Sequence, residues 1–146
     1  MQMVVFSGVQ GAGKSTYFHD RFSTTHVRLS LDLLKTRNRE DILLYACLAA
    51  QQDMVIDNTN PTTEQRQRYC GLAKAAGFEA VLYYFDISLE EAIVRNARRP
   101  EKQRVPEIGV RGTFAKLQKP TTREGFDSMF VVKSEGLTGW TVESLK

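Results

Sequence analysis

The sequence predicts a three-layer α/β fold with a mostly parallel sheet of five strands and helices on both faces. Short apolar runs alternate with segments of helical spacing along the chain. The first run, residues 3–7, is almost continuously apolar, as is typical of a central parallel strand covered on both sides. It leads directly into the glycine-rich stretch Gly8–Ser15, which precedes a helix-forming segment. Parallel strands joined by helical crossovers follow from this order.

The stretch Gly8–Ser15 has the pattern G-x-x-x-x-G-K-[ST] of a P-loop. Glycines let successive backbone N–H groups point toward phosphate oxygens, and the start of the next helix adds unpaired N–H groups. Lys14 would reach the β- and γ-phosphates, and the Ser15 hydroxyl would ligate Mg²⁺. The residues expected to bind ATP are Gly8, Gly11, Ala12, Gly13, Lys14, Ser15 and Thr16. The fold is thus predicted to be P-loop NTPase/kinase-like.

Length and composition predict one ordinary globular domain over residues 1–146. The chain has 42% apolar and 25% charged residues. No apolar run approaches the roughly 20 residues of a membrane span, and no signal peptide is visible. Cys47 and Cys70 lack metal-ligand spacing, and we expect two buried, reduced thiols. These features and the use of ATP favour the cytoplasm and no membrane partner; no oligomeric state is predicted.

The remaining elements follow from periodicity and capping signals. We expect strands at 27–30, 54–56, 81–85 and 130–133. Helices are expected from the P-loop to about Phe22, from about 39 to 52, from 61 to a terminating Gly77, from 88 to 98, and from 106 to about 119. Capping boxes at Thr62–Gln65 and Ser88–Glu91 mark two helix starts. In 39–52, the apolar residues that recur at helical spacing are Ile42, Leu43, Tyr45, Ala46, Leu48 and Ala49. The tail 134–146 has no clear element, and Trp140 within it is expected to pack.

The topology gathers polar residues at one edge of the sheet. In parallel sheets, ligands bind outside the carboxyl ends of the strands. The P-loop follows the first strand, Asp32 follows the second, and Asp57–Asn60 follow the third. Asp57 is in the Walker-B position, where a carboxylate orients Mg²⁺. The alternative for Asp57 is a residue that only starts a turn or caps a helix.

Asp32 is the more diagnostic carboxylate. A kinase that phosphorylates a hydroxyl needs an acceptor for the hydroxyl proton beside the γ-phosphate. An aspartate directly beyond the second strand, a strand that flanks the P-loop strand in many kinases, suits that need. The alternative is that Asp32 is the N-cap of the following helix.

Basic residues are concentrated after the fourth predicted strand. The net charge of +3 is too small to indicate nucleic acid by itself. The basic residues of this segment are Arg95, Arg98, Arg99, Lys102, Arg104, Arg111, Lys116, Lys119 and Arg123. Arg95 and Arg99 share a helix face, and residues 95–119 would form a lid over the triphosphate. The alternative is a solvated surface.

The chain resembles the 5′-kinase domain of polynucleotide kinases, of the animal and phage types, over about residues 4–132. The matching pieces are Gly8–Ser15, Asp32, Ile56–Pro61, Arg66–Tyr69, Ala75–Phe78, Leu89–Ala92, Arg95-Asn96 with Arg99, and Glu124–Phe126. The P-loop alone is unspecific. Asp-Asn-Thr-Asn-Pro in register with the upstream aspartate and the downstream Arg-Asn-x-x-Arg is much more specific.

The resemblance implies ATP-dependent phosphorylation of a 5′-hydroxyl end of DNA or RNA. Carried over by position, Lys14, Asp32, Arg99 and the neighbouring Arg95 would be catalytic, with Asp32 as general base. Ser15 and Asp57 would hold Mg²⁺. The substrate would contact Asp32, Lys35, Asp57, Asn58 and Asn60. The phage enzyme has an arginine where this chain has Lys35, which keeps the charge but loses the planar fork. With no phosphatase or forkhead-type domain here, neither 3′ processing nor recruitment is expected.

Three alternatives remain open at this level. A kinase of a nucleoside, sugar or antibiotic would share the P-loop, the aspartate and the arginine lid. A non-catalytic ATP-binding module would not need the base at Asp32. An end-processing phosphodiesterase would need a paired H-x-[ST] signature, and the sequence has only His19 and His26, which lie outside the predicted site.

Overall fold

The computed structural model describes residues 1–135 and 139–145. The strands are β1 (Gln2–Ser7), β2 (Val27–Leu29), β3 (Met54–Ile56), β4 (Glu79–Phe85), β5 (Ser128–Ser134) and β6 (Trp140–Ser144). The helices are α1 (Lys14–Arg21), α2 (Leu31–Leu34), α3 (Arg37–Ala50), α4 (Thr63–Ala75), α5 (Leu89–Ala97) and α6 (Glu107–Lys116), with 3₁₀ turns η1 (Glu101–Gln103) and η2 (Thr122–Glu124). No helix in these ranges has the length and apolar character needed to cross a membrane.

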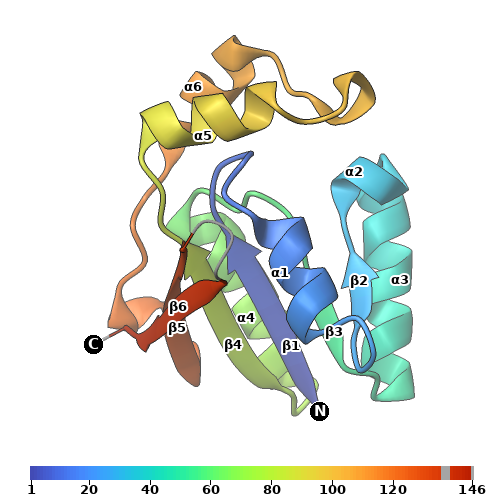
Figure 1. Cartoon of the computed structure of the whole chain (residues 1–146). Helices are drawn as coiled ribbons and strands as arrows, with labels where there is room; N and C mark the ends of the chain where they lie inside the picture. Colours follow the sequence, from blue (N-terminus) through green and yellow to red (C-terminus); the bar gives the residue numbers. More distant parts are fainter. Residues whose placement is uncertain (136–138, 146) are drawn as a thin grey trace.

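The sheet has the strand order β2-β3-β1-β4-β5-β6 (Figure 1). Neighbouring strands are parallel except β5 and β6, which are antiparallel. The predicted P-loop kinase-like α/β class with a mostly parallel sheet is confirmed. The prediction of five strands is wrong, because the part of the chain that the structure describes forms a sheet of six.

The sixth strand lies in the predicted tail. β6 pairs with β5, with Ser134 opposite Trp140 and Phe130 opposite Ser144. Val142, Glu143 and Ser144 are exposed at this edge of the sheet, so β6 lacks the apolar alternation of a half-buried strand. Residues 136–138 and 146 of the predicted tail lie outside the described residues.

The second strand does not flank the P-loop strand, contrary to expectation. β3 lies between β2 and β1 and pairs with both. The three residues of β3 are fully buried, whereas Val27 of β2 is exposed. The buried strand therefore takes the inner position, and β2 forms the edge.

Alternation along β1 divides the core into two layers. Met3 and Val5 point toward α3 and α4, while Val4 and Phe6 point toward α1, α5 and α6. Cys47 and Cys70 lie in the first layer as free, buried thiols, as predicted, and burial raises the pKa of both. Both faces of the sheet are thus covered, which explains the apolar character of β1.

The helix starts follow the capping signals. Thr62 and Gln65 form the predicted capping box of α4, and the Ser88 side chain accepts a hydrogen bond from the Glu91 N–H at the start of α5. In α3 the buried side is formed by Glu40, Leu44 and Cys47, whereas Ile42, Leu43 and Tyr45 are exposed. Helical spacing predicted α3 but did not identify its buried face.

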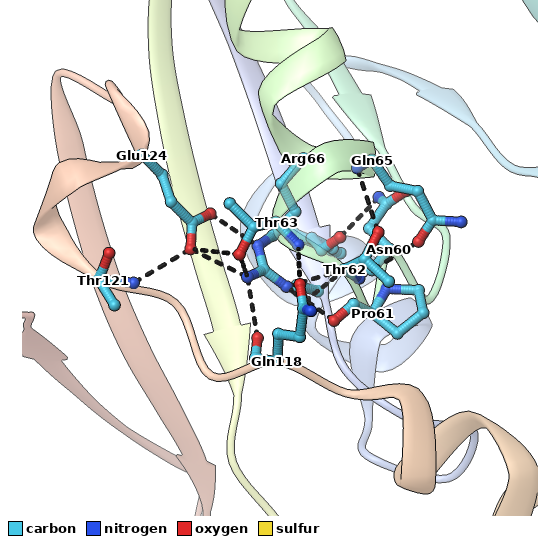
Figure 2. Close-up of polar contacts among 11 residues, drawn as sticks. Asn60, Pro61, Thr62, Thr63, Gln65, Arg66, Gln118, Thr121 and Glu124 are labelled. Carbon is cyan, nitrogen blue, oxygen red and sulfur yellow. Dashed lines mark hydrogen bonds and ion pairs between the residues drawn. The ribbon is translucent and has the colours of Figure 1, made fainter.

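A buried arginine joins segments from three parts of the chain (Figure 2). Arg66 and Glu124 are both buried, and the Arg66 Nε and Nη2 atoms donate to Glu124 at 2.8 and 2.9 Å. Arg66 Nη1 donates to the carbonyl oxygens of Asn60 at 3.2 Å and Pro61 at 3.1 Å, and to the Ser7 hydroxyl at 3.3 Å. The network connects the end of β1, the loop after β3 and the segment after α6.

Removing the buried cation should destabilise the fold. We expect Arg66→Met to lower the free energy of unfolding by about 3–5 kcal/mol, because Glu124 stays buried without its cationic partner. The matched control is Arg111→Met, which removes an exposed pair with Glu107 and should cost at most about 1 kcal/mol. Urea denaturation followed by circular dichroism measures both, and equal losses would contradict the proposed importance of the buried pair.

Candidate functional site

A cavity of about 680 Å³ lies at the carboxyl ends of the parallel strands. Its walls come from the P-loop, from the segments after β2 and β3, from α5 and the segment after it, and from the β5–β6 edge. The lining residues are Gln10, Gly11, Gly13, Lys14, Ser15, Thr16, Leu31, Asp32, Asp57, Asn58, Thr59, Glu91, Arg95, Arg98, Arg99, Val105, Ser134 and Trp140. Residues from distant parts of the sequence therefore meet at one site.

The P-loop has the backbone that phosphate binding requires. Gly11 and Gly13 have φ values of 85° and 96°, which favour glycine. A Cβ on Gly11 would lie 2.7 Å from the Ala92 carbonyl oxygen of α5, so only glycine fits there. Gly13 is the N-cap of α1 and gives no side-chain cap, so the N–H groups of the first turn can bind an anion.

Two backbone hydrogen bonds fix the P-loop, one to the loop after β3 and one within the P-loop itself. The Gly8 N–H donates to the Thr59 carbonyl oxygen at 2.9 Å, and the Ala12 N–H donates to the Val9 carbonyl oxygen at 3.2 Å. Ala12 is buried, whereas Thr16 is exposed and lines the cavity. The loop after β3 thus holds the start of the P-loop in place.

Lys14 lies across the P-loop. Its ammonium group donates to the carbonyl oxygens of Gly8 and Val9, each at 2.9 Å. Desolvation lowers the pKa of Lys14 to about 8; Asp57 and Asp32 raise this pKa, and Arg99 lowers it. Asp57, Asp32 and Arg99 come from the segments after β3, β2 and α5, so charges from three parts of the chain act on this one ammonium group.

Asp57 and Ser15 are in contact, and a third residue, which sequence reasoning missed, joins them. The Ser15 hydroxyl donates to Asp57 Oδ2 at 3.2 Å. Arg28 of β2 donates from Nε to Asp57 Oδ2 at 2.7 Å and from Nη2 to Ser15 Oγ at 2.9 Å. Asp57 is buried, so this pair is largely shielded from water. The sequence feature that could have identified Arg28 is a charged residue inside the short predicted strand at 27–30.

Asp32 lies in the first turn of α2, at the cavity wall. The N-caps of α2 and α3 are Ser30 and Thr36, so the alternative that Asp32 caps the following helix is wrong. Asp32 is exposed, and its carboxylate makes no hydrogen bond or ion pair within residues 1–135 and 139–145. Unlike Asp57, this carboxylate remains available to an external group.

The structure does not bring all of the predicted substrate residues to the cavity. Asn58 lines it, but its Oδ1 accepts from the Leu31 N–H at 2.9 Å and its Nδ2 donates to Glu40 at 2.7 Å. Asn60 is buried, with a φ of 40°, and its amide donates to the Phe6 carbonyl oxygen. Lys35 is exposed at the end of α2 and is not among the lining residues.

Three arginines form the wall opposite the P-loop. Arg95 and Arg99 line the cavity, as does Arg98, which sequence reasoning did not single out. Arg95 pairs with Glu91 at 3.0 Å, and Arg99 Nη1 donates to the Gln103 carbonyl oxygen at 3.5 Å. Adjacent arginines before Pro100 were the signal for Arg98. One guanidinium group can donate two parallel hydrogen bonds to phosphate oxygens, so this wall of three arginines suits a polyphosphate.

One hydrogen-bonded pair braces the segment that carries this wall, and another contact joins the segment to the P-loop. Within the segment, the Asn96 side chain accepts from the Val105 N–H at 3.0 Å and donates to the Val105 carbonyl oxygen. Gln10 of the P-loop donates from its Nε2 to the Thr113 hydroxyl of α6 at 3.1 Å. These contacts hold the predicted lid region beside the P-loop.

Comparison with known proteins gives a consistent result. Residues 3–121 match the AAA domain family. A bifunctional polynucleotide phosphatase/kinase of Schizosaccharomyces pombe is 28% identical over 134 residues, which are 88% of this chain and 32% of that protein. The chain therefore spans about a third of the length of this curated relative.

Among the solved structures that share the fold are a Kti12 protein and a gluconokinase. Chaetomium thermophilum Kti12, in complex with ADP-AlF3, has a TM-score of 0.64 and 18% identity, covering 91% of this chain and 89% of that one. A gluconokinase from Sinorhizobium meliloti 1021 has a TM-score of 0.60 and 16% identity, covering 92% of this chain and 83% of that one. At these identities the likeness supports the P-loop kinase-like fold, which implies nucleotide binding.

The lowered pKa of Lys14 predicts a pH-dependent affinity for polyphosphate. Bound phosphates favour the charged ammonium group and raise its pKa, so binding takes up a proton once the pH exceeds about 8. Relative to Lys14→Arg, which cancels the ionisation of the ligand itself, affinity for tripolyphosphate should be constant below about pH 8 and fall by up to about tenfold per pH unit above it. Calorimetry without metal measures this. The control, Lys14→Arg, keeps its charge and should lack this decline; an equal decline in both proteins would contradict the assignment to Lys14.

The Arg28–Asp57 pair should be energetically coupled. Arg28→Met leaves the buried Asp57 without its cation, and we expect a loss of about 1–3 kcal/mol in the free energy of unfolding. A double-mutant cycle with Asp57→Asn should give a coupling energy of about 0.5–3 kcal/mol. Additive losses in the double variant would show that the contact contributes nothing.

Proposed function

The chain belongs to the AAA domain family, and from this premise we propose that it is an ATP-dependent kinase that phosphorylates the 5′-hydroxyl end of a polynucleotide. The observation that carries the proposal is the position of Asp32. Its exposed carboxylate lies in the same cavity as Lys14 and the arginine wall. A module that only binds ATP has no need of a free carboxylate there.

The acceptor class rests on the curated relative. The matched protein is a polynucleotide phosphatase/kinase, and the match covers most of this chain. Its name supports a polynucleotide as the acceptor, and the 5′-hydroxyl end is what the resemblance of the motifs implies. The gluconokinase shares only the fold, so a small-molecule hydroxyl is the competing acceptor that the experiment must test.

The proposed mechanism is in-line transfer of the γ-phosphoryl group. Asp32 accepts the proton of the attacking hydroxyl, because an unpaired carboxylate at the cavity wall can reach an incoming group. Lys14 donates to the β- and γ-phosphates, exchanging its contacts with the Gly8 and Val9 carbonyl oxygens for phosphate oxygens. Arg95 and Arg99 stabilise negative charge on the transferring group from the opposite wall.

A magnesium ion fits the residues at the base of the cavity. The Ser15 hydroxyl and Asp57 carboxylate oxygens are 3.2 Å apart, and oxygen ligands are those that Mg²⁺ prefers. Mg²⁺ held there would supply positive charge that offsets the negative charge of the phosphates. The Arg28 guanidinium contacts the same two oxygens, so we expect it to give up at least one contact when Ser15 and Asp57 hold the metal.

The reaction can be tested with γ-labelled ATP and Mg²⁺. The acceptor panel contains 5′-hydroxyl DNA and RNA oligonucleotides, a 5′-phosphorylated control, and a pool of nucleosides and sugars. We expect label on the 5′-hydroxyl oligonucleotides alone. Label confined to a small molecule would retain the kinase and replace the acceptor, and no label on any acceptor would refute the proposal.

Asp32→Asn should lower the transfer rate by about 10²–10⁴-fold, because the amide cannot accept the proton. ATP binding should be retained. The matched control is Asp41→Asn, which changes a partly exposed carboxylate of α3 that pairs with Arg68. Its rate should equal that of the wild type. A fully active Asp32→Asn variant would exclude Asp32 as the base.

A further inference from the structure

Trp140 is the single tryptophan of the chain and lies beyond the segment that matches the family. It begins β6, opposite Ser134 of β5. The sequence predicts only a packing role for it. In the structure it also lines the cavity, together with the P-loop and the arginine wall.

The indole is fixed by contacts on several sides. The ring centroids of Trp140 and Tyr17 are 5.1 Å apart and the ring planes meet at 86°. The indole Nε1 donates to Asp20 Oδ2 at 3.2 Å. A Cβ on Gly13 would lie 2.8 Å from Trp140 Cη2, so the indole packs against the glycine that starts α1. Trp140 is nevertheless only half-buried, and part of its surface faces the cavity.

The strand order places Trp140 at the end of the cavity away from the carboxylates. Asp32 and Asp57 follow β2 and β3, which lie on one side of β1, whereas Ser134 and Trp140 belong to β5 and β6 on the other side (Figure 1). The P-loop after β1 lies between these two groups. A triphosphate on the P-loop whose γ-phosphate faces Asp32 must therefore extend its ribose and base toward Trp140.

We propose that Trp140 is the base-binding residue of the nucleotide site, an inference that rests on the proposed use of ATP. Its N–H group already donates to Asp20, so the indole contributes a stacking surface instead of a hydrogen bond to a base edge. Every nucleobase has a π-face, and stacking is therefore tolerant of base identity. We accordingly expect ATP and GTP to bind with similar affinity.

A comparison of ATP with tripolyphosphate tests this, because tripolyphosphate lacks the base but can occupy the P-loop. Trp140→Leu should weaken ATP binding about ten- to a hundredfold and leave tripolyphosphate binding unchanged, as measured by calorimetry. Trp140→Phe keeps an aromatic face and should retain most of the ATP affinity. In the wild type, ATP should change the fluorescence of the single tryptophan more strongly than tripolyphosphate does.

Two results would overturn the assignment. Equal ATP affinity in the wild type and Trp140→Leu would show that the indole does not contact the base. Equal losses for ATP and tripolyphosphate would show that Trp140 acts only by supporting Gly13 and the P-loop. Both measurements are of binding, so they stay informative if phosphotransfer to an oligonucleotide fails.

Discussion

The buried Arg66 guanidinium is the constraint on which the arrangement of the site depends. A charged group without solvent needs partners for its N–H groups, and Arg66 finds them on Ser7, Asn60, Pro61, Gln118 and Glu124 (Figure 2). These partners come from the end of β1, the loop after β3 and the segment after α6. The hydrogen bonds of the Arg66 side chain thus set the spacing between the P-loop strand and the segment that carries Asp57.

A second buried acidic side chain, Glu40, helps to position the segment that carries Asp32. Glu40 is fully buried in α3 and accepts hydrogen bonds from Tyr69 at 2.6 Å and Asn58 at 2.7 Å. Burial, with the hydrogen bond and charge of Glu40, raises the pKa of Tyr69 to about 12, so the phenol stays a donor near neutral pH. Asn58 in turn holds the Leu31 N–H, directly before Asp32. Asn58 therefore fixes the turn that carries Asp32, the proposed general base.

Charge is distributed unevenly along the cavity. Arg95, Arg98 and Arg99 form one wall, while Asp32 and Asp57 lie beyond the P-loop toward β2. Like charges on a wall repel one another until an anion lies between them, and Arg99 is one cause of the lowered pKa of Lys14. A bound polyphosphate would relieve both effects at once. The arginine wall thus suits a polyphosphate, and the carboxylates of Asp32 and Asp57 lie at another part of the cavity.

The sequence by itself determined the fold class, the P-loop and the placement of Asp32 and Asp57 at one edge of the sheet, because local patterns and the rule for parallel strands suffice for these. Only the tertiary structure showed the partners of each side chain. Asn60, which was predicted to contact the substrate, is buried and donates to the Phe6 carbonyl oxygen of β1. Arg28 of β2 donates to Asp57, which follows the neighbouring strand β3. Strand β6 is stabilised by pairing with β5, not by its own periodicity. Such contacts join residues far apart in the chain, and no local spacing encodes them.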